Sequence, residues 1–155
     1  MTKQTVYLII AVFLGLSINL PVLANRVNTF IDNGNGSVSD IATGLVWQQQ
    51  DDDVTRNHAE AITYCQDLSL AGSSNWRLPN VKELLSIVDY RADRPSIDDT
   101  IFLGTNFGNN TQFYWSATSP GDNLANACFV GFDDGLSLCN VPKNTDGLLF
   151  VRCVR

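Results

Sequence analysis

The sequence is poor in the residues that most catalytic and metal sites need. It contains a single histidine, His58, and four cysteines, none of which form a close Cys-x-x-Cys pair. One histidine cannot build a multi-histidine metal site, and cysteine zinc sites need such close pairs. Basic residues are also scarce, with 10 lysines and arginines against 16 acidic residues. This balance argues against a nucleic-acid-binding protein, which usually carries a basic face.

The first 24 residues have the layout of a secretory signal peptide. Lys3 provides a positive start, residues 6–20 form an apolar stretch, and small residues close the segment. A membrane-spanning helix needs about 20 apolar residues, and this stretch is too short and contains polar residues. We therefore expect cleavage before Asn25 and a single domain over residues 25–155. The mature chain would be secreted or periplasmic in a bacterium, with no stable membrane anchor and a net charge of −7 instead of −6, because only Lys3 is lost.

The cysteines predict two disulfide bonds, because an even number of cysteines in an exported chain usually means bridges. Cys128 and Cys139 flank the turn signal Asp133-Asp134-Gly135, and a hairpin there would place them opposite each other. Cys65 and Cys153 then remain for the second bridge. That bridge would connect the first predicted helix to the C-terminal segment.

Two helices are predicted, each beginning with a capping box. Asn57 is followed three residues later by Glu60, and Asn80 by Glu83. Apolar residues then recur at helical spacing after both caps, the second helix ending near residue 90. His58 lies at the start of the first helix and is interpreted as a surface or capping side chain.

The rest of the chain predicts short strands and polar loops. Residues 51–53 are three consecutive aspartates and are interpreted as a solvated acidic loop, and residues 91–112 as a long irregular loop in which Phe107 is one of the core anchors. The order of elements predicts an α+β domain. Apolar runs bounded by turn residues predict strands at 29–31, 44–48, 113–117, 127–132, 136–141 and 150–155.

Several short motifs occur together in the order and spacing of a known family. The motifs are Phe30-Ile31-Asp32-Asn33-Gly34, Thr43-Gly44-Leu45-Val46-Trp47-Gln48, Ala61-Ile62-Thr63-Tyr64-Cys65, Trp76-Arg77-Leu78-Pro79-Asn80, Tyr114-Trp115-Ser116, Phe129-Val130-Gly131-Phe132 and Val151-Arg152-Cys153-Val154-Arg155. With these motifs, the sequence resembles, over nearly the whole predicted mature chain, the C-terminal domain of the Legionella collagen-like adhesin, a family long described as a domain of unknown function.

The resemblance implies a C-type-lectin-like fold, which is also similar to that of the formylglycine-generating enzymes. Such a fold would have a small twisted antiparallel sheet, two helices, long ligand-displaying loops and nested disulfides. The family is associated with sulfated polysaccharides, which this negatively charged chain would repel. Sulfate binding would require a local basic patch, for which the candidates are Arg77, Arg91, Arg94 and Lys143. The chain has no Gly-X-Y tract, so collagen-driven trimerisation does not carry over, and no oligomeric state is predicted.

We expect no catalytic residues, because bridged cysteines and one histidine leave little material for an activated nucleophile. The sequence favours an exported, non-catalytic module that binds glycans or other cell-surface ligands. The alternatives are a structural or protein-interaction protein of the periplasm or cell surface and, less favoured, a redox or formylglycine-type enzyme. Aromatic rings and planar polar side chains commonly bind sugars. The candidate ligand-binding residues of this kind are Tyr114, Trp115, Asn123, Asn126, Asp133 and Asp134.

Calcium is the one cofactor that the sequence suggests, and only weakly. Residues 32–40 have the Asp/Asn/Gly spacing of a calcium loop, but the segment lacks the remote bidentate glutamate of such loops. The calcium-lectin signatures Glu-Pro-Asn and Trp-Asn-Asp are also absent. We therefore expect no metal or other cofactor and keep calcium as the alternative.

Overall fold

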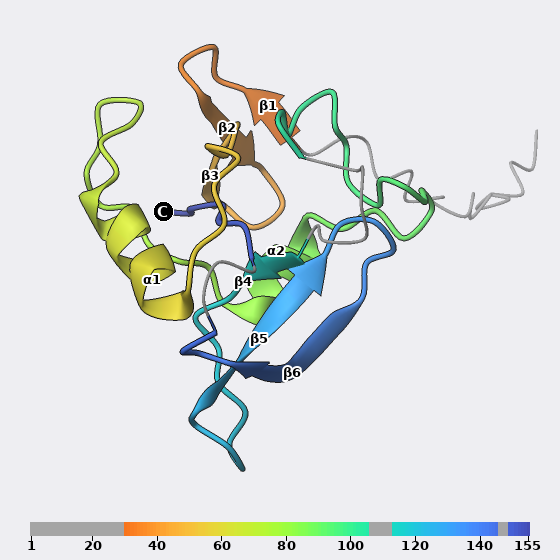
Figure 1. Ribbon diagram of the computed structural model, residues 1–155. Coiled ribbons are helices and arrows are strands. Elements are labelled where there is room, and N and C mark those ends of the chain that lie inside the picture. The colour runs from red at the N-terminus through yellow and green to blue at the C-terminus, as the bar shows by residue number, and fades with distance from the viewer. Residues whose placement is uncertain (1–29, 106–112, 146–148) are drawn as a thin grey trace, which may run out of the picture.

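The computed structural model describes residues 30–105, 113–145 and 149–155 (Figure 1). The predicted signal peptide and the predicted core anchor Phe107 lie outside these residues. The described residues form two helices and short antiparallel strands, which confirms the α+β class. Within these ranges, no helix is both long and apolar enough to cross a membrane.

The strands form two separate three-stranded sheets, so the prediction of one sheet is wrong. The first sheet contains β1 (Phe30–Asp32), β2 (Ser37–Asp40) and β3 (Val46–Gln48), in that order. The second contains β4 (Phe113–Trp115), β5 (Asn126–Gly131) and β6 (Ser137–Pro142). All neighbouring strands are antiparallel.

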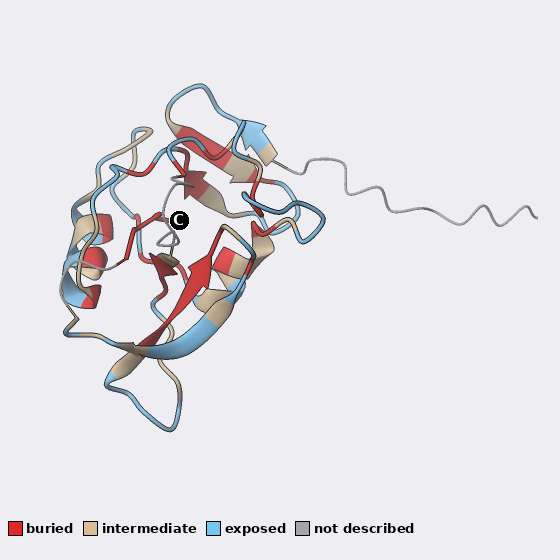
Figure 2. Cartoon of the chain, turned by 45° about the vertical axis from the view of Figure 1, so that its right-hand side comes forward, coloured by how far each residue is buried: buried red, intermediate tan, exposed pale blue. Residues whose placement is uncertain are grey.

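The C-terminal segment, residues 149–155, connects the two sheets. The amide of Gln48 in β3 donates to the carbonyl of Cys153 at 2.9 Å, and the amide of Trp115 in β4 donates to the carbonyl of Phe150 at 3.1 Å. Residues 149–154 are all buried. The prediction of a regular strand at 150–155 is therefore wrong, because this segment forms only isolated bridges to several neighbours and is covered on both sides. Figure 2 shows the buried residues of this segment and of β5, while β6 is mostly exposed.

The helices α1 (His58–Asp67) and α2 (Val81–Ser86) begin where the capping boxes predicted. At α1, the side chain of Asn57 accepts from the amide of Glu60 at 3.0 Å, and Glu60 accepts from the amide of Asn57 at 3.1 Å. The second helix ends at Ser86, before the predicted end near residue 90. The inner face of α1 buries Ala61 and Cys65 against the core.

Both predicted disulfides are confirmed. Cys65 in α1 is bonded to Cys153, with a Cα–Cα distance of 5.5 Å, and Cys128 in β5 is bonded to Cys139 in β6. Cys65 and Cys153 are fully buried, whereas Cys139 is exposed. The first bridge therefore attaches α1 to the C-terminal segment inside the core, and the second crosses a surface hairpin.

The side chain of Arg152 is fully buried and is surrounded by oxygen acceptors from distant segments. It pairs with the carboxylate of Asp51 at 3.4 Å, and Asp51 also accepts a hydrogen bond from Tyr114. Burial raises the pKa of Asp51, and the charge of Arg152 and the hydrogen bond from Tyr114 oppose that rise. The prediction of a solvated acidic loop is therefore wrong for Asp51, which is buried. The other acceptors are the carbonyls of Gln48, Gln49 and Leu103 and the hydroxyl of Thr105.

Replacing Arg152 by methionine should destabilise the protein by about 3–5 kcal/mol, because it leaves the buried Asp51 carboxylate and several carbonyls without their donor. The measurement is urea unfolding at neutral pH. The matched control is Arg91→Met, which breaks a surface ion pair with Asp89 and should leave the midpoint almost unchanged. Equal losses in the two variants would contradict this account of Arg152.

Mild reduction should open the Cys128–Cys139 bridge before the Cys65–Cys153 bridge. A thiolate must reach a sulfur atom to attack it, and only the Cys128–Cys139 bridge includes an exposed residue. Alkylation of the native protein after increasing doses of reductant, followed by peptide mass spectrometry, would establish the order. Labelling of Cys65 at or before the dose that labels Cys139 would show that the inner bridge is accessible without unfolding.

Candidate functional site

The two aromatic residues predicted to bind a ligand lie in the core. Tyr114 is fully buried, with its ring 5.0 Å from that of Phe132 and 5.8 Å from that of Phe150 between centroids. Trp115 is also fully buried, and its indole donates to the carbonyl of Arg56 at 2.7 Å. The prediction that these rings stack on a sugar is wrong, because neither ring has a face open to solvent.

The four polar residues predicted to bind a ligand lie at two ends of one strand. Asn126 is the first residue of β5 and Asn123 precedes the strand, whereas Asp133 and Asp134 follow its end. Because a strand rises about 3.3 Å per residue, the ends of β5 are roughly 16 Å apart. The structure therefore does not bring these four side chains together around one small ligand.

A groove of about 560 Å³ lies instead along the outward face of α1. This volume is within the usual range of about 300–1,000 Å³ for small-molecule sites. Four of the lining residues lie at positions i, i+3, i+4 and i+7 of α1, which fall on one face of a helix. They are Glu60, Thr63, Tyr64 and Asp67. In the sequence, the apolar spacing of this helix indicates only its inner face. The lining includes Arg56, Glu60, Thr63, Tyr64, Asp67 and Leu68.

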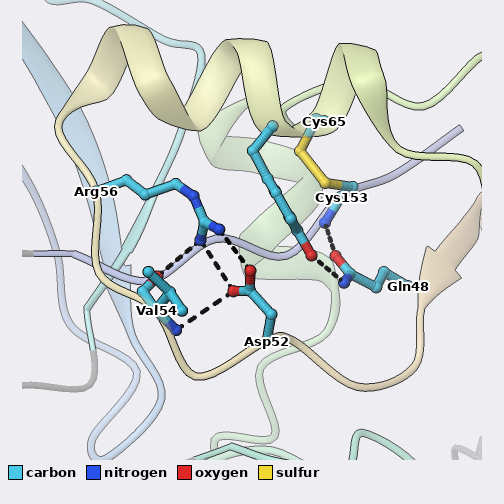
Figure 3. Close-up of a disulfide and its surroundings, with 7 residues drawn as sticks. Gln48, Asp52, Val54, Arg56, Cys65 and Cys153 are labelled. Atoms are coloured by element: carbon cyan, nitrogen blue, oxygen red, sulfur yellow. Dashed lines mark hydrogen bonds and ion pairs between the residues drawn. A yellow bond between two sulfur atoms is a disulfide. The ribbon is translucent and has the colours of Figure 1, made fainter.

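Arg56 is held at one side of the groove by an ion pair and an aromatic ring. Its guanidinium forms two hydrogen bonds with the carboxylate of Asp52, at 2.9 and 2.5 Å, and lies 4.0 Å from the ring centroid of Tyr64. Figure 3 shows Asp52 and Arg56 facing each other below α1. Partial burial would raise the pKa of Asp52, but the hydrogen bonds and charge of Arg56 outweigh it and lower that pKa. The positive charge of Arg56 is thus matched within the protein.

A chain of two hydrogen bonds fixes the hydroxyl group of Tyr64. The amide of Cys153 donates to Gln48 Oε1 at 3.0 Å, and Gln48 Nε2 donates to the hydroxyl oxygen of Tyr64 at 2.8 Å (Figure 3). A backbone amide can only donate, so the orientation of the Gln48 side chain is determined and Tyr64 must accept. The hydroxyl hydrogen of Tyr64 therefore remains for another acceptor. Burial raises the pKa of Tyr64, which keeps this hydrogen in place at neutral pH.

Three of the four basic residues that a sulfate-binding patch would need already have partners. Arg77 pairs with Glu83 at 2.7 Å, and Arg91 pairs with Asp89 at 2.8 Å. The ammonium group of Lys143 donates to a backbone carbonyl at 2.8 Å. These contacts leave less positive charge for a sulfated ligand than the sequence alone suggests.

His58 is buried, so its interpretation as a surface side chain is wrong. Its Nε2 lies 3.0 Å from the carbonyl oxygen of Ser116, and its ring packs edge-on against Trp115 at 5.3 Å. Burial lowers the pKa of His58. Over residues 30–105, 113–145 and 149–155, no group of three or more His, Cys, Asp or Glu side chains is placed to hold a metal ion.

The buried His58 should make the protein less stable in mild acid. Its folded-state pKa lies below the ordinary value of 6.5, so below that pH the unfolded chain binds more protons and the free energy of unfolding falls. His58→Gln should reduce this loss, measured as the difference between urea unfolding midpoints at pH 7 and at about pH 5. An equal loss of stability in the wild type and the variant would contradict this role.

Comparison with known proteins identifies the family. No curated protein and no solved structure matches the chain. The family model described as the Lcl C-terminal domain matches residues 36–155, a range that includes both helices, both disulfides and the groove. This match confirms the resemblance inferred from the short motifs. The chain belongs to the Lcl C-terminal domain family.

Proposed function

We propose that this protein is an exported, non-catalytic, adhesin-like module that binds a cell-surface glycan through the groove on α1. Its family suggests an adhesin-like role. Two disulfides are compatible with an extracellular or periplasmic location. We also propose that its α+β architecture is a variant of the C-type-lectin-like fold, with the ligand on the face of the helix instead of the loops.

The fixed hydroxyl of Tyr64 is the observation that carries this proposal. A sugar offers hydroxyl oxygens that accept hydrogen bonds and C–H faces that pack on apolar surface. Tyr64, which can donate its hydroxyl hydrogen, and Leu68, which offers apolar surface, both line the groove. Thr63 donates to the carbonyl of Ala59 at 3.1 Å, so its hydroxyl oxygen can accept from a sugar.

The site is held rigid by the covalent structure behind it. Tyr64 is adjacent in α1 to Cys65, which is bonded to Cys153. The amide of Cys153 in turn positions Gln48, which holds the hydroxyl of Tyr64. A pre-organised site loses less conformational entropy on binding, which favours recognition of a weakly interacting ligand such as a sugar.

The placement of the nucleophiles supports a non-catalytic role. All four cysteines are in disulfides, and His58 is buried against Trp115 with one ring nitrogen near a backbone carbonyl. An activated nucleophile needs an adjacent base and access to substrate. Neither the cysteines nor His58 meet these conditions.

A glycan array probed with the oxidised protein from an exporting host tests the proposal. We expect binding that Tyr64→Phe weakens about two- to ten-fold, because the variant removes one hydrogen-bond donor and keeps the ring. The control is Tyr90→Phe, which alters an exposed tyrosine outside the groove and should bind normally. Repeating the array with a chelator tests the calcium alternative.

Two results would contradict this proposal. One is the absence of any glycan ligand, which would favour the protein-interaction alternative. The other is a glycan whose affinity is the same for the wild type and Tyr64→Phe, which would place the site elsewhere on the molecule.

A further inference from the structure

We propose that the groove on α1 selects glycans that carry a free amine, such as de-N-acetylated amino sugars, over N-acetylated or sulfated ones. The inference rests on the proposed function and specifies its ligand class. It comes from the charges around the groove and from the direction of its hydrogen bonds.

The carboxylates in and beside the groove outnumber its one positive group. Arg56 is paired with Asp52, so its charge is compensated. Glu60, which also accepts from the amide of Asn57, and Asp67 contribute two further carboxylates to the lining. They are seven residues apart on one helix face, or about 10 Å along the axis, with Tyr64 between them. A positively charged ligand is therefore attracted here, and a sulfated one is repelled.

The end of α1 strengthens this preference. The C-terminus of a helix carries partial negative charge, and proteins commonly place Lys, Arg or His in the last turn to offset it. The last turn of α1 contains no basic residue, and its final residue is Asp67. An ammonium group of a ligand would interact favourably with both the Asp67 carboxylate and the helix terminus.

The hydrogen-bonding groups distinguish an amino sugar from a lysine side chain. An ammonium group only donates, so it suits the carboxylates of Glu60 and Asp67. The hydroxyl hydrogen of Tyr64 needs an acceptor, which an ammonium group cannot provide. An amino sugar offers an ammonium group and hydroxyl oxygens on one compact ring. Acetylation removes its charge and so removes the interaction with both carboxylates.

Titration of the oxidised full-length protein with defined oligosaccharides tests this inference. The probes are glucosamine oligomers, N-acetylglucosamine oligomers of equal length, and heparin. We expect the glucosamine oligomers to bind most tightly and to weaken as salt is raised. Asp67→Asn and Glu60→Gln should each lower their affinity about two- to five-fold. Glu60→Gln keeps the helix cap, because glutamine also serves in a capping box.

The control variant is Asp122→Asn, which removes an equal charge from an exposed loop outside the groove and should bind like the wild type. Equal or tighter binding of the N-acetylated oligomers, still weakened by Tyr64→Phe, would overturn this inference and leave the proposed function standing. Heparin binding more tightly than the glucosamine oligomers would also overturn it. So would a loss of affinity in Asp122→Asn equal to the losses in Asp67→Asn and Glu60→Gln. No binding of any glycan would overturn both proposals.

Discussion

The buried guanidinium of Arg152 is the interaction on which the arrangement of this protein depends. A charge inside a protein is tolerated only when it is paired and its hydrogen-bonding capacity is used. The two terminal nitrogens of Arg152 meet this requirement by drawing together the chain after β3, including Asp51, and the loop at residues 103–105, whereas its Nε has no partner among the described residues. Tyr114 of β4 joins the same cluster through its hydrogen bond to Asp51. One side chain thus ties together both sheets and a long loop.

The neighbouring residue extends this arrangement to the surface. Cys153 follows Arg152 and is bonded to Cys65, which fixes α1 against the same C-terminal segment. The amide of Cys153 also orients Gln48 and, through it, the hydroxyl of Tyr64 in the groove. The proposed binding surface is therefore an outward continuation of the core, and its geometry depends on the last few residues of the chain.

Local features of the fold could be predicted from the sequence, because they depend on residues close together in the chain. The capping boxes at Asn57 and Asn80 and the hairpin between Cys128 and Cys139 are of this kind. The burial of Asp51 and His58 could not be predicted in this way, because their partners lie far along the chain. One signal was present in the sequence: Arg152 lies inside an apolar run, and a charge in such a run needs a buried acceptor.

The candidate site could be predicted least well. Tyr114 and Trp115 lie near polar loops in the sequence, which predicted a ligand-binding surface, but their strand is covered on both sides. Tyr64 lies in one of the family motifs, but the three-to-four-residue spacing of apolar side chains that marks a helix indicates its inner face and says little about the outer one. The signal available in the sequence was Tyr64 between the acidic residues Glu60 and Asp67, at the spacing of one helix face.

The most direct test of the central claim is to map the ligand-binding surface by nuclear magnetic resonance. Amide resonances of the oxidised, isotope-labelled protein would be followed during titration with a glucosamine oligomer. Our account predicts that the perturbed amides cluster in residues 56–69, along α1 and the groove. Perturbations confined to the ends of β5, around Asn123 or Asp134, would contradict it and return the site to the loops.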